Sequence, residues 1–347
     1  MARYPTLKDV ALRAGTSAAT VSYVLNGAEG RYVSPEMRER VLAAVEAVGY
    51  IKSSPASSLH GKRRGVIALL VPQFSNAYFT QLMVAIESVV EREGYLLSIC
   101  NTFDDPERER DIIVKMAAQR VDGYIVIPTV AAARNTAPIR KLDVPLVLVD
   151  RPITGVEDAA PQITPDNFGS GFQLGRHLGE AGHRRAAYLG WVSGFDALDD
   201  RRRGFWEGLR AAADSPVDEV SYAGEFSLRA GYDLAARALH EHPDLTALCM
   251  GFNVPARGSV NYLAEQGIVP GRDLSVVLIG APDWAMTGQN DFTLVDLLPE
   301  EIGRRAAEEL LLELSASNAG RGRTVVEGRL RVGTSVTNLT GSEETRR

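Results

Sequence analysis

A short stretch near the start of the chain places small and polar side chains on one face of a predicted helix. Residues 18–25 have helical periodicity, with Val21, Val24 and Leu25 on one face. The opposite face carries Ala18, Ala19, Ser22 and Tyr23. Outward residues near the N-terminus of such a helix can reach base edges in a major groove. The chemistry expected here is therefore recognition of DNA.

The residues before this helix have clear end signals. Thr6 and Asp9 form a capping-box pattern, and Gly15 ends the helix that they start. Ser17 then caps the helix over 18–25. Two short helices joined by a tight turn predict a helix-turn-helix, which makes double-stranded DNA the first partner to consider.

A third helix follows, with Ser34 as its N-cap, Pro35 at its first position and Gly49 after its last apolar residue. Its expected buried stripe comprises Met37, Val41, Leu42, Val45 and Val48. Three helices of this length predict a small all-α headpiece.

From residue 66 onward, apolar runs alternate with amphipathic helices. Strands are expected over 66–71, 96–100, 123–127, 146–149, 186–189, 220–223, 248–250 and 276–279. Helices are expected over 77–93, 106–120, 131–142, 167–181, 201–213, 228–240 and 255–266. This alternation predicts an α/β body of two doubly wound subdomains, built on parallel sheets covered on both faces, with a cleft between them. A tail adds a strand near 293–297, a helix over 299–317 and a strand near 325–332.

Charge divides the chain at the same boundary. Residues 1–64 hold ten basic and five acidic side chains, a net charge of +5, whereas 28 basic and 39 acidic residues give the remainder −11. A basic head on an acidic body favours contact with phosphates through the head.

Cys100 and Cys249 lie in apolar runs, which favours buried thiols in a reducing compartment. Neither a signal peptide nor a membrane span is evident, so a cytoplasmic protein is expected.

The order of the three helices, followed by Tyr50 and the segment 53–59, resembles the headpiece and hinge of the lactose-repressor (LacI/GalR) family of bacterial transcription factors. The resemblance implies base reading by Ala18, Ala19 and Tyr23. It implies phosphate contact by Thr16, Ser17, Thr20, Ser22 and Asn26. It also implies that Ala56 contacts the minor groove and that Leu59 wedges into its central step. The chain departs from the family at Lys52, Ser53 and Ser57, where Pro-Asn and an arginine are common.

The body resembles the core of the same family and the periplasmic sugar-binding proteins, in which the chain crosses between lobes three times. The expected domains are a headpiece over 1–52, a linker over 53–64, a core over 65–340 and a tail over 341–347. Within the core, the first lobe is expected to comprise 65–162 with 292–322, and the second lobe 163–291 with 323–340.

Candidate effector contacts lie where strands end. Asn76, Tyr78 and Phe79 follow the first strand of the body, at the edge where open α/β sheets bind ligands; an amide and two aromatic rings suit a sugar or a base. The resemblance adds Asp150, Arg151, Arg201, Phe226, Asn253 and Asp283. Polar residues of the family are replaced by Phe252 and Leu297, so the effector has fewer hydroxyls than a free hexose, or small-molecule control has been lost.

No catalytic constellation competes with this interpretation. The five histidines lack metal-ligand spacing, and no phosphate-binding loop motif is present. The sequence predicts a homodimeric, ligand-responsive transcriptional regulator, most simply a repressor, that needs no cofactor or metal and is not an enzyme. The alternatives are a solute-binding protein without its signal peptide, a small-molecule enzyme, and a regulator without effector control.

Overall fold

A computed structural model describes residues 4–26, 32–51, 63–156, 160–286, 288, 291–315 and 322–340. The chain divides into two compact units, residues 1–64 and 65–347. Most of the expected linker over 53–64, including Ala56 and Leu59, lies outside the described residues.

The head consists of α1 (Leu7–Ala14), α2 (Ala18–Asn26) and α3 (Pro35–Val48). Local chemistry fixes their ends as the sequence predicted. Thr6 and Asp9 form a reciprocal capping box, and Gly15 ends α1 in the left-handed conformation with φ 64°. Ser34 caps α3 through the Met37 amide. Ser17 similarly accepts a hydrogen bond from the Thr20 amide at 3.1 Å.

The head packs around Val10, Val21, Val24 and Val41. Leu42 was expected in this core, but the side chain is 52% exposed, and Ala44 is buried instead. The reason is the helical period, since position 44 follows Val41 by three residues whereas position 42 lies about 100° around the helix.

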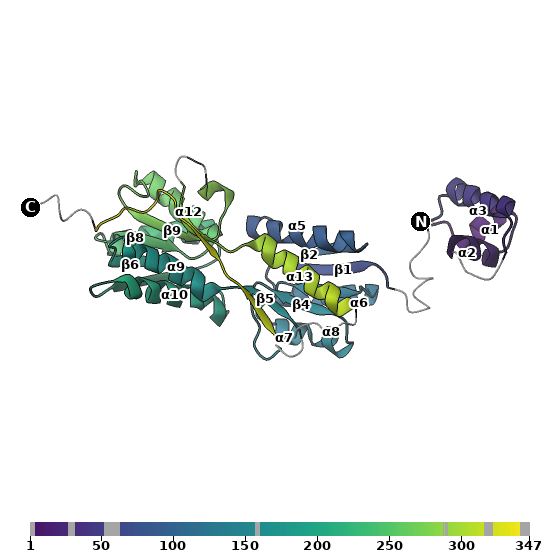
Figure 1. Ribbon diagram of the computed structural model, residues 1–347, viewed down its shortest axis with the longest axis horizontal. Helices are drawn as coiled ribbons and strands as arrows, with labels where there is room; N and C mark the ends of the chain where they lie inside the picture. Colours follow the sequence, from purple (N-terminus) through teal and green to yellow (C-terminus); the bar gives the residue numbers. More distant parts are fainter. Residues whose placement is uncertain are drawn as a thin grey trace, which may run out of the picture. The chain divides into compact units, whose positions relative to one another are not determined.

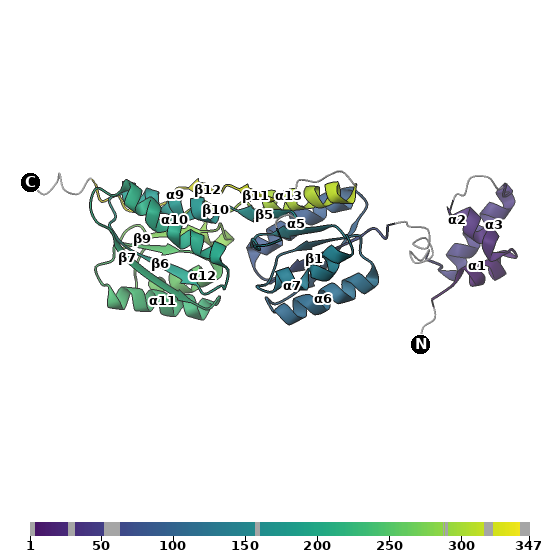
Figure 2. The same ribbon diagram turned by 90° about the horizontal axis from the view of Figure 1, so that it is seen from below.

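The first lobe of the core is a parallel sheet in the order β11-β5-β4-β3-β1-β2. Its strands are β1 (Val66–Val71), β2 (Leu96–Asn101), β3 (Gly123–Val126), β4 (Leu146–Val149), β5 (Gln162–Pro165) and β11 (Arg323–Val326). Its helices are α5 (Ala77–Arg92), α6 (Pro106–Gln119), α7 (Ala132–Asn135), α8 (Ala137–Lys141) and α13 (Pro299–Leu314). α5 and α13 cover one face, and α6 to α8 lie on the other (Figure 2).

The second lobe has the order β12-β10-β9-β8-β6-β7, in which only the pairing of β12 with β10 is antiparallel. Its strands are β6 (Arg185–Trp191), β7 (Asp218–Gly224), β8 (Ala247–Met250), β9 (Ser275–Ile279), β10 (Thr293–Asp296) and β12 (Arg329–Arg331). α9 (Asn167–Glu180) and α10 (Asp196–Ala212) cover one face, and α11 (Leu228–Glu241) and α12 (Asn253–Glu265) cover the other (Figure 2); Figure 1 shows α12 and α9 on opposite sides of the sheet.

The strands join the two sheets differently from the expected lobe boundaries. β5 and β11 pair with each other in the first sheet, although 163–291 and 323–340 were expected in the second lobe. β10 pairs with β9 in the second sheet, although 292–322 was expected in the first lobe. The single strand expected near 325–332 is two strands in different sheets. An apolar pattern fixes a strand but not its partner, because pairing here joins residues about 160 positions apart.

The helix expected over 131–142 is two short helices, α7 and α8. Pro138 explains the break, because it lacks an amide hydrogen and its ring clashes with the carbonyl four residues earlier.

Glycines allow α9 and α10 to pack with their backbones in contact. A Cβ atom at Gly175 would lie 1.9 Å from the Phe205 carbonyl oxygen, and one at Gly208 would lie 2.1 Å from that of Phe172.

The membrane and thiol expectations can be compared with the structure. No helix in the described part of the chain is long and apolar enough to cross a membrane. Cys249 is buried in β8, whereas Cys100 in β2 is half-buried.

Candidate DNA-binding face and effector pocket

The α2 helix presents small polar side chains from consecutive turns. Ser17, Ala19 and Asn26 are exposed, and Thr16, Thr20, Ser22 and Tyr23 are half-buried. The Ser17 and Thr20 hydroxyls lie 2.9 Å apart, and the Asn26 amide donates to the Ser22 hydroxyl at 2.9 Å. Ala18 packs partly against the head core, so of the two expected alanine readers Ala19 has the more accessible methyl group. Arg40 ties α3 to the end of α1 by donating to the Ala14 carbonyl at 2.6 Å.

A pocket lies between the two lobes of the core, at the carboxyl edges of both sheets. It is lined by eight of the nine expected effector residues, namely Asn76, Tyr78, Phe79, Asp150, Arg151, Arg201, Phe226 and Asn253. Its cavity measures about 60 Å³. Side chains separated by as many as 177 positions in the sequence therefore meet at one site.

Asp283 is the exception. It is exposed in a short 3-10 helix and lines a wider surface groove beside the pocket. The pocket is instead closed there by the preceding Ala281 and Pro282. Strand β9 ends at Ile279, so Ala281 and Pro282 come just after the strand end and lie at the cleft, whereas Asp283 lies further along the loop.

An amide pair connects the lobes at the pocket. Asn76 is the N-cap of α5, and its Oδ1 accepts hydrogen bonds from the Tyr78 amide at 3.1 Å and from Asn253 Nδ2 at 2.8 Å. Asn253 begins α12 in the second lobe. The pair therefore forms a direct polar contact across the cleft.

A buried tyrosine and carboxyl group form the first-lobe wall. The Tyr78 hydroxyl donates to Asp150 Oδ1 at 2.6 Å. Burial raises the pKa of Asp150, while Arg151 and the Tyr78 hydrogen bond oppose that shift. Burial and the adjacent Asp150 raise the pKa of Tyr78 well above its ordinary value, so Tyr78 remains a donor. Asp150 has φ 72°, a strained conformation of the kind found at ligand clamps.

Arg201 supplies the cation of the second lobe and is 6% exposed. Nε donates to Asn167 Oδ1 at 2.8 Å, and Nη1 donates to the Gly251 carbonyl at 3.0 Å. Its guanidinium carbon lies 4.7 Å from the centre of the Phe252 ring. Arg201 is thus held in place within its own lobe, while the neighbouring Arg202 and Arg203 are exposed.

Three aromatic rings form the second-lobe wall. The Trp191 ring centre lies 4.9 Å from that of Phe226 and 5.6 Å from that of Phe252. Phe226 was expected at the site and Phe252 was recognised from the sequence as an apolar replacement, whereas Trp191 was not predicted. A detectable signal was its place at the end of a strand, the same criterion that selected Asn76.

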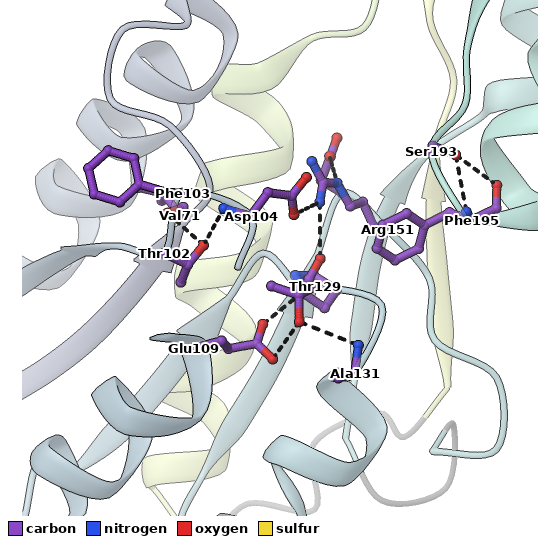
Figure 3. Close-up of polar contacts among 12 residues, drawn as sticks. Val71, Thr102, Phe103, Asp104, Glu109, Thr129, Ala131, Arg151, Ser193 and Phe195 are labelled. Carbon is purple, nitrogen blue, oxygen red and sulfur yellow. Dashed lines mark hydrogen bonds and ion pairs between the residues drawn. The ribbon is translucent and has the colours of Figure 1, made fainter. Parts of the chain in front are cut away.

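Arg151 lines the pocket but is mainly engaged elsewhere. Its Nη1 donates to Asp104 at 2.5 Å and to the Pro128 carbonyl at 3.3 Å (Figure 3). The described residues contain no group of three or more His, Cys, Asp or Glu side chains placed to hold a metal ion.

A helix-turn-helix head and a two-lobed core with a polar and aromatic pocket define the class of ligand-responsive DNA-binding regulators. The model of periplasmic binding proteins and sugar-binding domains of the LacI family matches residues 64–325. The model of bacterial regulatory proteins of the lacI family matches residues 6–53. The chain belongs to the LacI family of transcriptional regulators.

Individual relatives agree with this assignment. The chain is 30% identical to a transcriptional repressor PurR from Mannheimia succiniciproducens, over 78% of this chain and 80% of the relative. It is 30% identical to a ribose operon repressor from Halalkalibacterium halodurans, over 78% and 79% of the two chains. A LacI-family regulator from Silicibacter pomeroyi superposes with a TM-score of 0.79 at 26% identity, covering 96% of this chain and 99% of the other. The Lac repressor dimer bound to operator has the same fold, with a TM-score of 0.80 at 24% identity and coverage of 96% and 100%.

Proposed function

We propose that the chain acts as a homodimeric repressor whose affinity for a pseudo-palindromic operator is set by a small molecule bound between the two lobes. The observation that carries this proposal is the convergence of eight expected contact residues from both lobes on one pocket. The helix-turn-helix supplies the DNA-binding face, with Ser17, Ala19 and Tyr23 of the head directed to the operator. The proposal includes action by binding rather than catalysis, and a location in the cytoplasm, where bacterial operator DNA is found.

The pocket chemistry favours a small effector with an aromatic or otherwise flat apolar face. Trp191, Phe226 and Phe252 offer ring faces, while Asp150 and Arg201 offer one acceptor and one cation. Ligand pockets usually measure about 300–1,000 Å³, so a cavity of about 60 Å³ requires the lobes to separate before a sugar or a base enters. Relatives of known structure include regulators bound to ribose and to cellobiose.

A second candidate is a regulator without effector control. It is supported by the pairing of the polar pocket groups with one another, as in the contacts of Asn76 with Asn253 and of Tyr78 with Asp150. A hexose would have to displace these internal hydrogen bonds, and buried donors left without partners are costly.

Dimerisation is supported by the geometry of operators and by exposed apolar residues. Two half-sites require twofold symmetry, since one headpiece buries too little surface to be specific. β2 is an edge strand of the first sheet, and its Leu96 and Ile99 are exposed, as is Val84 on α5. Exposed edges and apolar patches of this kind are places where protein chains associate.

A thermal-shift screen of sugars, sugar phosphates and nucleobases on the full chain tests effector binding. A compound at about 100 times its dissociation constant stabilises the protein by about 2.7 kcal/mol. Phe226→Leu should abolish the shift, whereas Phe168→Leu, a half-buried phenylalanine outside the pocket, should retain it. A shift that survives in both variants would place the compound at another site. Specific operator binding with no stabilising compound would favour the second candidate.

A further inference from the structure

Arg151 is anchored firmly to the first lobe although its guanidinium reaches the second. The side chain is 5% exposed. Nη1 donates to Asp104 at 2.5 Å and to the Pro128 carbonyl at 3.3 Å, and Nε lies 3.9 Å from Asp150 Oδ2. All of these partners belong to loops at the carboxyl edge of the first sheet.

The opposite side of the same guanidinium faces two rings of the second lobe. Its central carbon lies 5.0 Å from the centre of the Phe195 ring and 5.4 Å from that of Trp191. Figure 3 shows Arg151 between Asp104 and Phe195. A cation this close to ring faces is attracted to them, and more strongly where water is excluded. Arg151 therefore contacts both lobes directly.

The backbone on the anchoring side is held in sparsely populated conformations. Phe103 and Asp104 have φ values of 54° and 59°, and Asp150 has φ 72°. Left-handed conformations are unfavourable for residues with a Cβ atom and persist where surrounding contacts impose them. Both the residue before Arg151 and its ion-pair partner are thus strained, as expected for a clamp.

A buried carboxyl group supports the loop that carries Pro128. Glu109 Oε2 accepts from the Thr129 amide at 2.7 Å, and its Oε1 accepts from the Thr129 hydroxyl at 2.9 Å and from Asn135 Nδ2 at 2.8 Å. This loop also approaches the second lobe closely, because a Cβ atom at Gly194 would lie 3.2 Å from Val130.

We propose that Arg151 is an interlobe clamp and a positioning residue for the pocket. Its stacking holds the lobes closed and fixes Trp191 against Phe226 and Phe252, which keeps the cavity small. Entry of an effector requires the guanidinium to leave the rings, so the clamp sets the balance between open and closed cores. The inference rests on the two-lobed core and not on the identity of an effector.

The clamp can be tested on the full chain without any ligand. The three tryptophans, at positions 191, 206 and 284, all lie in the second lobe. Labelling with 5-fluorotryptophan gives three fluorine resonances, of which that of Trp191 is assigned by its loss in W191F. Arg151→Ala should shift this resonance and leave the other two unchanged. Small-angle X-ray scattering of the same variant should show a larger radius of gyration.

Arg108→Ala is the matched control. Arg108 lies 4.9 Å from the Phe103 ring and donates to the Asn101 carbonyl at 2.8 Å, so it makes the same kinds of contact within the first lobe only. Loss of the Arg151 stacking should raise the ratio of open to closed cores roughly tenfold, which corresponds to about 1.4 kcal/mol. The control should leave that ratio unchanged.

A second variant covers the case in which Arg151→Ala fails to fold. Phe195→Leu keeps apolar volume and leaves Arg151 paired with Asp104, yet it removes one ring and should move the Trp191 resonance in the same direction. Arg151→Lys should give a partial effect, because it keeps the charge without the planar stack. Scattering profiles and Trp191 resonances equal to those of the unmodified protein in both Arg151→Ala and Phe195→Leu would overturn the proposal. Because no effector is used, a failed effector screen would not affect this result.

Discussion

His183 should make the stability of the second lobe depend on pH. The ring is fully buried. Nε2 lies 3.1 Å from the Thr337 carbonyl, which can only accept, so Nε2 carries the proton; Nδ1 lies 2.9 Å from the Thr246 hydroxyl. Burial, with smaller contributions from Arg184 and His177, lowers the pKa of His183 to about 4, against the opposing effect of the Thr337 hydrogen bond.

The sign and size of the effect follow from proton linkage. The unfolded chain takes up the proton near pH 6.5, whereas the folded chain takes it up only near pH 4. Stability from neutral His183 is therefore complete above pH 6.5 and is lost as the pH falls towards 4. Between pH 7.5 and 4.5 the loss amounts to about 2–3 kcal/mol.

Urea unfolding followed by tryptophan fluorescence measures this loss, because all three tryptophans report on the second lobe. His183→Asn should be less stable at pH 7.5 but should lose about 2–3 kcal/mol less than the unmodified protein on acidification. His240→Gln, at an exposed position, is the control and should follow the unmodified protein. Equal losses in all three proteins would refute the assignment of a buried, neutral His183.

Three further substitutions probe the packing, the pocket and the linker. Gly175→Ala should destabilise the core by about 2 kcal/mol net in thermal unfolding, because its Cβ atom would lie 1.9 Å from the Phe205 carbonyl; a neutral effect would contradict the close helix packing. Tyr78→Phe should cost about 1.5–3 kcal/mol in urea unfolding, since it removes a buried 2.6 Å hydrogen bond to Asp150. Leu59→Ala should weaken operator binding much more than binding to random DNA, as measured by fluorescence anisotropy; equal losses would make it an ordinary linker residue.

Features set by local chemistry could be predicted from the sequence. Thr6, Ser34 and Gly49 fix helix ends through bonds to neighbouring residues, so their patterns suffice. Asn76 was predicted at the cleft because it follows a strand of the body; its role as the N-cap of α5 was not predicted. The sequence patterns of the head and of the core also match known family models over residues 6–53 and 64–325, so the fold of both parts could be predicted.

Features that depend on distant partners could not be predicted. The sequence does not show that β5 pairs with β11, because the two strands are separated by most of the second lobe. Arg151 was expected to contact an effector and does line the pocket, but its ion pair with Asp104 was not predicted, because Asp104 lies in a left-handed turn that contains no glycine. Asp283 was predicted in the pocket from its position relative to the family pattern. In the structure it is exposed and lines the neighbouring groove instead.

The central claim is that occupancy of the pocket controls operator binding by the head. The most direct measurement is fluorescence anisotropy of the full chain with DNA fragments from near its own gene, across salt concentrations, with and without the compound that stabilises it most. The account predicts one preferred pseudo-palindromic fragment, a linear fall of log affinity with log salt, and a change in that affinity when the compound is added. Affinity independent of salt, or equal for all fragments and unchanged by the compound, would contradict it.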